Sequence, residues 1–144
     1  MIEAGVFNAT SREHFEKYGY ARLGCMLKRT ELEALKQRIN EIMLGEVVYK
    51  DMLFQLDSED GEYSNAPAAS LGHKGATLAY RKIMGLELDP VFLRYMQHPL
   101  FREITEYYIG NEVSIYRAMF MNKPADKGTE LPWHQDVGWG WGVD

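Results

Sequence analysis

The residues best suited to metal chemistry are His134 and Asp136, two positions apart in the run LPWHQD. Side chains alternate between the two faces of an extended strand, so this spacing directs the imidazole and the carboxylate to the same face. One histidine nitrogen and one carboxylate oxygen are two of the three ligands in the 2-His-1-carboxylate triad, which leaves open positions on Fe(II) for a co-substrate and dioxygen. We interpret the pair as two metal ligands, and the third should be another histidine.

Taken alone, a His-x-Asp tripeptide is more often a surface histidine hydrogen-bonded to a nearby aspartate. The other histidines are His14, His73 and His98, and none has a spacing that marks it as the third ligand. We expect His14 on the polar surface of a helix, and His73 and His98 at exposed or capping positions. The metal interpretation therefore needs support from the rest of the sequence.

Two cations fall within apolar, strand-like segments. Residues 77–84 alternate as in a strand, and one side of it would carry Leu78, Tyr80, Lys82 and Met84. Burying the Lys82 ammonium is costly unless an anion meets it, but a lysine on an edge strand also extends to solvent. Arg117 is a second candidate for an inward charge, and an internal salt bridge explains it as well as substrate binding does.

Three tryptophans surround the His-x-Asp pair, at positions 133, 139 and 141. They are suited to wall a substrate pocket, and they are equally suited to a core or an interface. We favour the core for Trp133 and leave the other two open.

Helices are predicted in the first part of the chain. Thr10 or Ser11 would cap a first helix that ends at Gly19, and a short strand would follow over 20–25. A second helix has capping-box spacing at Thr30 and Glu33 and ends at Gly45. Its apolar face would comprise Leu32, Leu35, Ile39 and Ile42.

The rest of the sequence, after Gly45, predicts two more helices and several strands. Asp89-Pro90 and Pro99 begin the helices, and the second of these ends at Gly110. Residues 57–75 have the composition of a long loop, and strands are expected over 77–84, 113–121 and 131–137. This order predicts an α+β domain whose sheet is only beginning where the sequence stops. We expect residues 1–144 to form a single domain.

Composition narrows the classes of function. The chain has 144 residues, is 46% hydrophobic and carries a net charge of −5, without a cluster of Lys and Arg on one face, so nucleic acid is not an expected partner. No run of about 18 apolar residues predicts a membrane span, and Cys25 is a single thiol. We expect a soluble, cytoplasmic protein, and the sequence does not specify its oligomeric state.

At this point the sequence resembles the phytanoyl-CoA dioxygenase family. The matching runs are MFMNKP at 119–124 and PWHQD at 132–136, with a variable polar loop between them. The opening Phe15-x3-Gly19-Tyr20 and the run Arg81-Lys82-Ile83 are also similar to the family, and the resemblance extends from about Ser11 onward.

The resemblance implies N-terminal helices packed on a partial double-stranded β-helix of the jelly-roll or cupin kind. It implies that His134 and Asp136 hold Fe(II), with 2-oxoglutarate as co-substrate beside Lys82, Met119 and Gln135. The expected activity is that of a 2-oxoglutarate-dependent dioxygenase that uses dioxygen to hydroxylate a small organic substrate, which the sequence does not name. Related halogenases replace the carboxylate that is Asp136 here, so hydroxylation is favoured.

The family's distal histidine and 2-oxoglutarate-binding arginine lie well beyond the HQD motif, and this sequence ends after Asp144. We therefore expect the double-stranded β-helix to be truncated after the His-x-Asp strand, and the 144-residue chain alone to turn over little 2-oxoglutarate. The alternative is a non-catalytic module that binds a small molecule or a partner.

Overall fold

The computed structural model describes residues 6–123 and 128–130, and it confirms the α+β class. The helices are α1 (Ala9–Tyr18), α2 (Arg29–Leu44), α3 (Pro90–Met96) and α4 (Pro99–Ile109), with short 3-10 helices at Tyr63–Asn65 and Leu86–Leu88. The strands are β1 (Leu53–Leu56), β2 (Ser70–Leu71), β3 (Tyr80–Met84) and β4 (Met119–Met121). None of the helices in the described ranges combines the length and apolar character that a membrane span needs.

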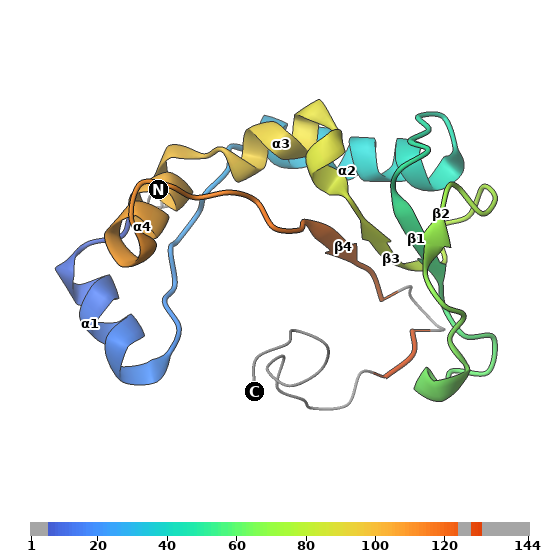
Figure 1. Cartoon of the computed structure of the whole chain (residues 1–144), viewed down its shortest axis with the longest axis horizontal. Helices are drawn as coiled ribbons and strands as arrows, with labels where there is room; N and C mark the ends of the chain where they lie inside the picture. Colours follow the sequence, from blue (N-terminus) through green and yellow to red (C-terminus); the bar gives the residue numbers. More distant parts are fainter. Residues whose placement is uncertain (1–5, 124–127, 131–144) are drawn as a thin grey trace.

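The four strands form one antiparallel sheet in the order β2-β1-β3-β4 (Figure 1). Phe54 of β1 faces Ile83 of β3, which faces Phe120 of β4. Because directly opposed residues of antiparallel strands project to the same side, these three side chains give the sheet one apolar face.

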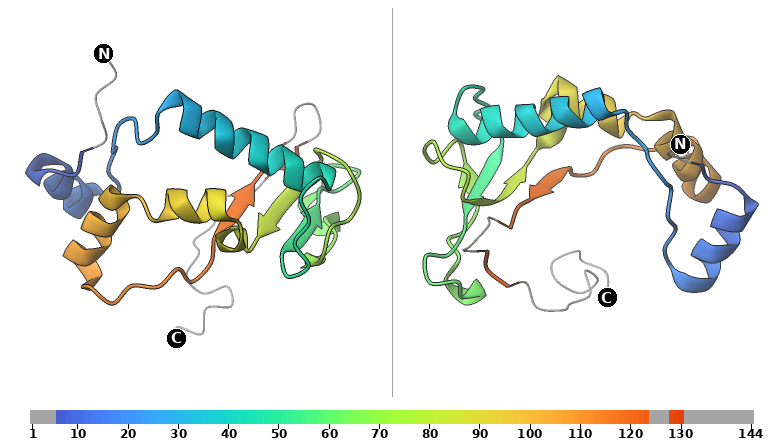
Figure 2. Two further views of the ribbon diagram at one scale, coloured as in Figure 1. Left: turned by 90° about the horizontal axis from the view of Figure 1, so that it is seen from above. Right: turned by 180° about the vertical axis from the view of Figure 1, so that it is seen from behind.

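Helix α2 covers that apolar face. Ile39, Ile42 and Met43 are buried on α2 and belong to one core cluster with Phe54 and Ile83. Helix α3 lies beside α2 on the same side, and no helix of the described residues covers the opposite face of the sheet (Figure 2). Within residues 6–123 and 128–130, the sheet thus has one face packed by helices and one face that no helix covers, which we call the open face.

A buried carboxylate fixes the start of α3. The side chain of Asp89 is fully buried and accepts from the backbone N–H groups of Val91 and Phe92, as its predicted N-cap role requires. It also accepts from the Tyr49 hydroxyl at 2.8 Å and pairs with Arg38 of α2 at 3.6 Å. Asp89 therefore joins α3 to α2 as well as capping it.

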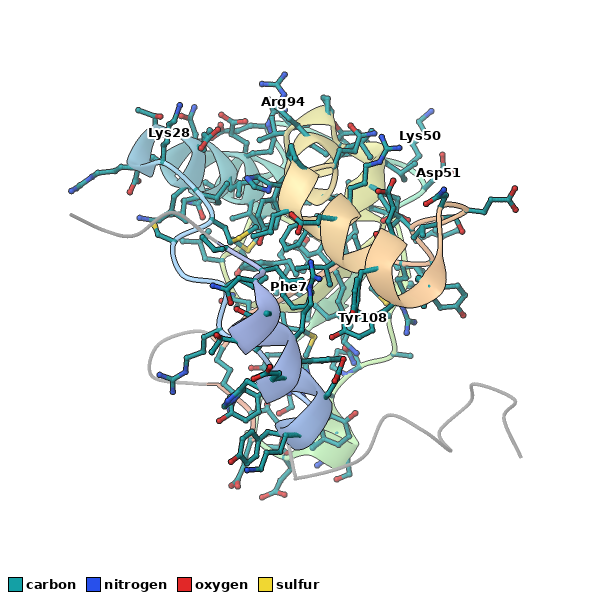
Figure 3. All side chains as sticks on the ribbon, turned by 90° about the vertical axis from the view of Figure 1, so that its left-hand side faces the viewer. Phe7, Lys28, Lys50, Asp51, Arg94 and Tyr108 are labelled. Carbon is teal, nitrogen blue, oxygen red and sulfur yellow. The ribbon has the colours of Figure 1, made fainter. Side chains whose placement is uncertain are left out.

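Helices α1 and α4 pack on each other away from the sheet. Phe7 lies edge-on to Tyr108, with ring centroids 6.0 Å apart, and Phe15 contacts the same ring at 5.1 Å (Figure 3). Arg12 of α1 forms an ion pair with Glu103 of α4 at 3.5 Å. These contacts form a small second cluster of side chains.

The helices occur where the sequence predicts them, but two N-caps differ. Asn8, rather than Thr10 or Ser11, caps α1 by accepting from the Ser11 N–H. Helix α2 begins at Arg29, where Glu31 accepts from the Lys28 N–H at 2.8 Å, so the predicted Thr30 box is wrong. Leu32, expected on the buried face, is 47% exposed because it precedes the part of α2 that lies over the core cluster.

The strand predictions need more correction. Residues 20–25 form no strand: Cys25 makes only an isolated β-bridge, and among the described residues the Val6 N–H donates to the Leu23 carbonyl oxygen at 3.1 Å. The strand expected over 113–121 is reduced to β4, which begins opposite Met84, the last residue of β3. Strands β1 and β2 were not predicted, since each is too short to show an alternating pattern.

Candidate functional site

A β-bulge in β3 positions the candidate co-substrate lysine. Gln55 is opposite Lys82 but the next residue of β1, Leu56, is opposite Tyr80, so Arg81 is an extra residue on β3. A bulge interrupts the alternation of side chains. Tyr80 and Ile83 consequently both lie in the core cluster, and the predicted grouping of Tyr80 with Lys82 on one side is wrong.

Lys82 lies on the open face of the sheet, opposite Met121. It is half-buried, and its pKa is lowered by burial and by the nearby charges of Arg81 and Arg117. Strand β3 has a neighbour on both sides, so the lysine does not extend from an edge strand. Within the part of the chain that the structure describes, the Lys82 ammonium makes no hydrogen bond or ion pair, so its charge is poorly compensated.

The structure brings Met119 close to this lysine. Met119 faces Met84 across the β3–β4 pair and is 38% exposed, while Lys82 faces Met121 in the same pair. Met119 and Met121 flank Phe120, which packs against the core, so both methionines project from the open face beside Lys82. Two of the five site residues predicted from the sequence therefore share one face.

The other three, His134, Gln135 and Asp136, lie outside the described residues. In residues 6–123 and 128–130, no three His, Cys, Asp or Glu side chains are grouped so as to hold a metal ion. Among the described residues that precede His134, Thr129 stands five positions before it and has a buried side chain.

Thr129 belongs to a cluster of buried polar side chains that was not predicted from the sequence. Its backbone N–H donates to Oδ2 of Asp57 at 3.1 Å, and its hydroxyl donates to Oδ1. The Ser58 hydroxyl lies 2.8 Å from Thr129 Oγ1, and Arg81 pairs with Asp57 at 3.5 Å. We call these four residues, Asp57, Ser58, Arg81 and Thr129, the Asp57 cluster.

The Asp57 cluster is shielded from solvent. The side chains of Asp57 and Arg81 are 7% and 5% exposed, and the Tyr63 ring lies 4.7 Å from the Arg81 guanidinium. Burial raises the pKa of Asp57, but the hydrogen bonds from Thr129, Ser58 and Arg81 outweigh it and hold that pKa below its ordinary value. The carboxylate is therefore charged and its acceptor capacity is used.

No local sequence signal marks the Asp57 cluster. Asp57 begins a polar loop, where an aspartate is unremarkable, and Arg81 and Thr129 follow it by 24 and 72 residues. Only the fold brings these side chains together.

The prediction for His73 is also corrected. Its ring packs against Phe54 and Tyr80 at centroid distances of 5.7 Å, and its Nε2 lies 3.0 Å from the Met43 carbonyl oxygen. It is thus a half-buried packing residue between α2 and the sheet. His98 caps α4 as expected, by accepting from the Leu100 N–H.

Comparison with known proteins identifies the family. The family model described as phytanoyl-CoA dioxygenase (PhyH) matches residues 15–139, which is most of the chain. The chain belongs to the phytanoyl-CoA dioxygenase family. The match includes Lys82 and Met119 on the open face as well as the HQD motif.

One curated protein shows how similar the chain is to a relative in this family and how much of that relative it covers. The chain is 27% identical over 141 residues to a probable phytanoyl-CoA dioxygenase of Caenorhabditis elegans, an alignment that covers 94% of this chain and 43% of the relative. The chain therefore spans less than half the length of that curated member of the phytanoyl-CoA dioxygenase family. No solved structure matches the chain significantly.

Proposed function

We propose that this chain carries part of the active site of an Fe(II)/2-oxoglutarate-dependent dioxygenase that hydroxylates a small organic substrate. Membership of the phytanoyl-CoA dioxygenase family supports an oxygenase. The observation that carries the proposal is the half-buried Lys82, which projects from the open sheet face beside Met119 with its charge poorly compensated.

The residues present fit a dicarboxylate co-substrate. Lys82 stands close enough to Arg81 and Arg117 for the positive charges of both to lower its pKa. An anion placed there would favour the protonated form of Lys82 and relieve the repulsion. A carboxylate of 2-oxoglutarate supplies such an anion.

The donor set also fits iron. His134 and Asp136 would hold Fe(II), with one imidazole nitrogen and one carboxylate oxygen, and Gln135 and Met119 would lie near the co-substrate. Iron, when bound, supplies the oxidative chemistry with dioxygen that hydroxylates the substrate. The part of this chain is to bind and orient the co-substrate and to shape access to the metal. A double-stranded β-helix, of which the described sheet would form part, is the architecture we propose for the whole protein.

Thermal melting tests this proposal. Mn(II), a redox-stable substitute with similar ligand preferences, is added together with 2-oxoglutarate. The melting temperature should rise, since a ligand at about 100 times its Kd stabilises a fold by about 2.7 kcal/mol. The rise should vanish in His134→Ala and persist in His14→Ala, which removes a histidine of α1 outside the proposed site.

A binding module without catalysis is the second candidate. It is favoured by an open groove of about 1070 Å³ between α2 and one end of the sheet, with apolar walls that include Ile39, Met43 and Phe120. If Mn(II) and 2-oxoglutarate leave the melting temperature unchanged in both the wild type and His134→Ala, the result would support the binding module and contradict the oxygenase.

A further inference from the structure

Thr129 stands five residues before His134, and the Asp57 cluster attaches it to the end of β1. We infer that Asp57 is a positioning residue, which sets the place of the segment bearing His134 and Asp136 relative to the sheet. This inference rests on the proposed function, because it gives the cluster a role in metal binding.

The bonding pattern supports positioning rather than loose attachment. Asp57 accepts from both the backbone N–H and the hydroxyl of Thr129, one on each carboxylate oxygen. Two bonds from one residue to a planar carboxylate fix direction as well as distance. The neighbouring Ser58 N–H donates to Oδ1 at 3.0 Å and holds the carboxylate in turn.

The cluster also reaches the co-substrate lysine. Arg81, which pairs with Asp57, is the bulge residue of β3 and precedes Lys82. One carboxylate thus joins the strand that carries Lys82 to the segment that leads to His134. The bulge and the Asp57–Arg81 pair together connect the strand that bears Lys82 to Thr129, which precedes the two proposed iron ligands in the sequence.

Structural support alone would predict a different result from positioning. The fold contains another hydrogen bond to a buried carboxylate, in which the Tyr49 hydroxyl donates to Asp89 at 2.8 Å. Tyr49→Phe removes that buried hydrogen bond without touching the Asp57 cluster. It serves as the matched control for loss of stability.

The experiment compares wild type with Thr129→Val, Asp57→Asn, Thr129→Ser and Tyr49→Phe. Hydrogen exchange is measured without metal in peptides that cover residues 128–137. Affinity for Mn(II) is measured by quenching of tryptophan fluorescence, because the chain's three tryptophans lie at 133, 139 and 141, around His134 and Asp136. Melting temperature is recorded for each variant.

Thr129→Val and Asp57→Asn should accelerate exchange in these peptides and weaken Mn(II) binding by about tenfold, the loss typical of a residue that orients a ligand. Thr129→Ser keeps the hydroxyl, so its hydrogen exchange and its Mn(II) affinity should equal those of the wild type. Tyr49→Phe should lower the melting temperature and change neither. If Asp57→Asn does not fold, Ser58→Ala removes the 2.8 Å contact to Thr129, together with the hydrogen bond of Ser58 to the exposed Asp60, and should give the same changes in smaller measure.

Unchanged exchange in Thr129→Val, or an equal change in Tyr49→Phe at an equal loss of stability, would overturn the inference. If exchange is accelerated in Thr129→Val but the wild type does not bind Mn(II), the positioning role of Asp57 would be upheld and the proposed function rejected. The two failures are therefore distinguishable.

Discussion

Lys82 faces Met121 across the β3–β4 pair, on the face of the sheet opposite the core formed by α2. Its pKa is held below the ordinary value of 10.5 by burial, Arg81 and Arg117. The protonated lysine consequently destabilises the folded chain at neutral pH. This unfavourable charge is what an anionic co-substrate would offset.

Lys82→Met should make the chain without ligand more stable than the wild type near pH 7. The difference should shrink as pH rises through the lowered pKa of Lys82 toward 10.5, because the wild-type lysine then loses its proton. Urea unfolding at a series of pH values measures it. Lys50→Met, at an exposed lysine, is the control and should show no such trend.

The same Lys82→Met variant should no longer be stabilised by 2-oxoglutarate, because the variant lacks the ammonium group that would pair with the carboxylate of 2-oxoglutarate. Equal stabilisation of wild type and Lys82→Met by 2-oxoglutarate, measured by thermal melting, would place the co-substrate elsewhere.

Acid should weaken the Asp57 cluster. The pKa of Asp57 lies below the ordinary value of 3.8, so its contribution to stability is complete above that value and is lost as pH falls through the lower, folded-state pKa. Asp57→Asn should cost about 1–3 kcal/mol at neutral pH and flatten the loss of stability below about pH 4. Urea unfolding measures both effects. Asp51→Asn, at an exposed carboxyl, should leave the acid limb of the wild type unchanged.

The buried Asp89 should matter more than its capping role alone. Asp89→Ala removes the N-cap of α3, which costs about 0.5–2 kcal/mol. It also removes the acceptor of the Tyr49 hydroxyl and one of the two carboxylate partners of Arg38, which keeps Glu41 at 3.1 Å. Urea unfolding should therefore show a loss above the range for a cap. A loss no greater than that of Tyr49→Phe would contradict the bridging role of Asp89.

Gly45 should not tolerate a side chain. Its φ is +77°, and a Cβ there would lie 2.9 Å from Cε1 of His73. Gly45→Ala should therefore lower the stability by at least about 1 kcal/mol, from backbone strain and from the contact. The double variant with His73→Ala, studied by urea unfolding, should show the two changes to be non-additive, whereas strict additivity would mean that the histidine moves away freely.

The sequence predicts the elements whose signals are local. The glycine ends of α1 and α2 and the Asp89-Pro90 start of α3 all occur as expected, because each depends on the conformational preference of one or two residues. Lys82 and Met119 were predicted as co-substrate residues from the resemblance to the family, and their role stays a prediction. The structure shows that they lie on the same face of adjacent strands.

What the sequence does not predict depends on distant partners. The bulge at Arg81 arises from pairing with β1, so alternation within residues 77–84 grouped Tyr80 with Lys82 wrongly. Strand β4 is short because β3 ends opposite Met119. The Asp57–Thr129 bonds join positions 72 residues apart, for which a single sequence carries no signal.

Anaerobic titration with Fe(II) in the presence of 2-oxoglutarate tests most directly whether His134 and Asp136 hold iron. Chelation of Fe(II) by a 2-oxo acid gives a visible charge-transfer absorption. We predict that this absorption appears on titration of the wild-type chain, saturates, and is lost in both His134→Ala and Asp136→Ala. The same absorption in either variant, at the same Fe(II) affinity, would contradict the assignment of these two residues as iron ligands.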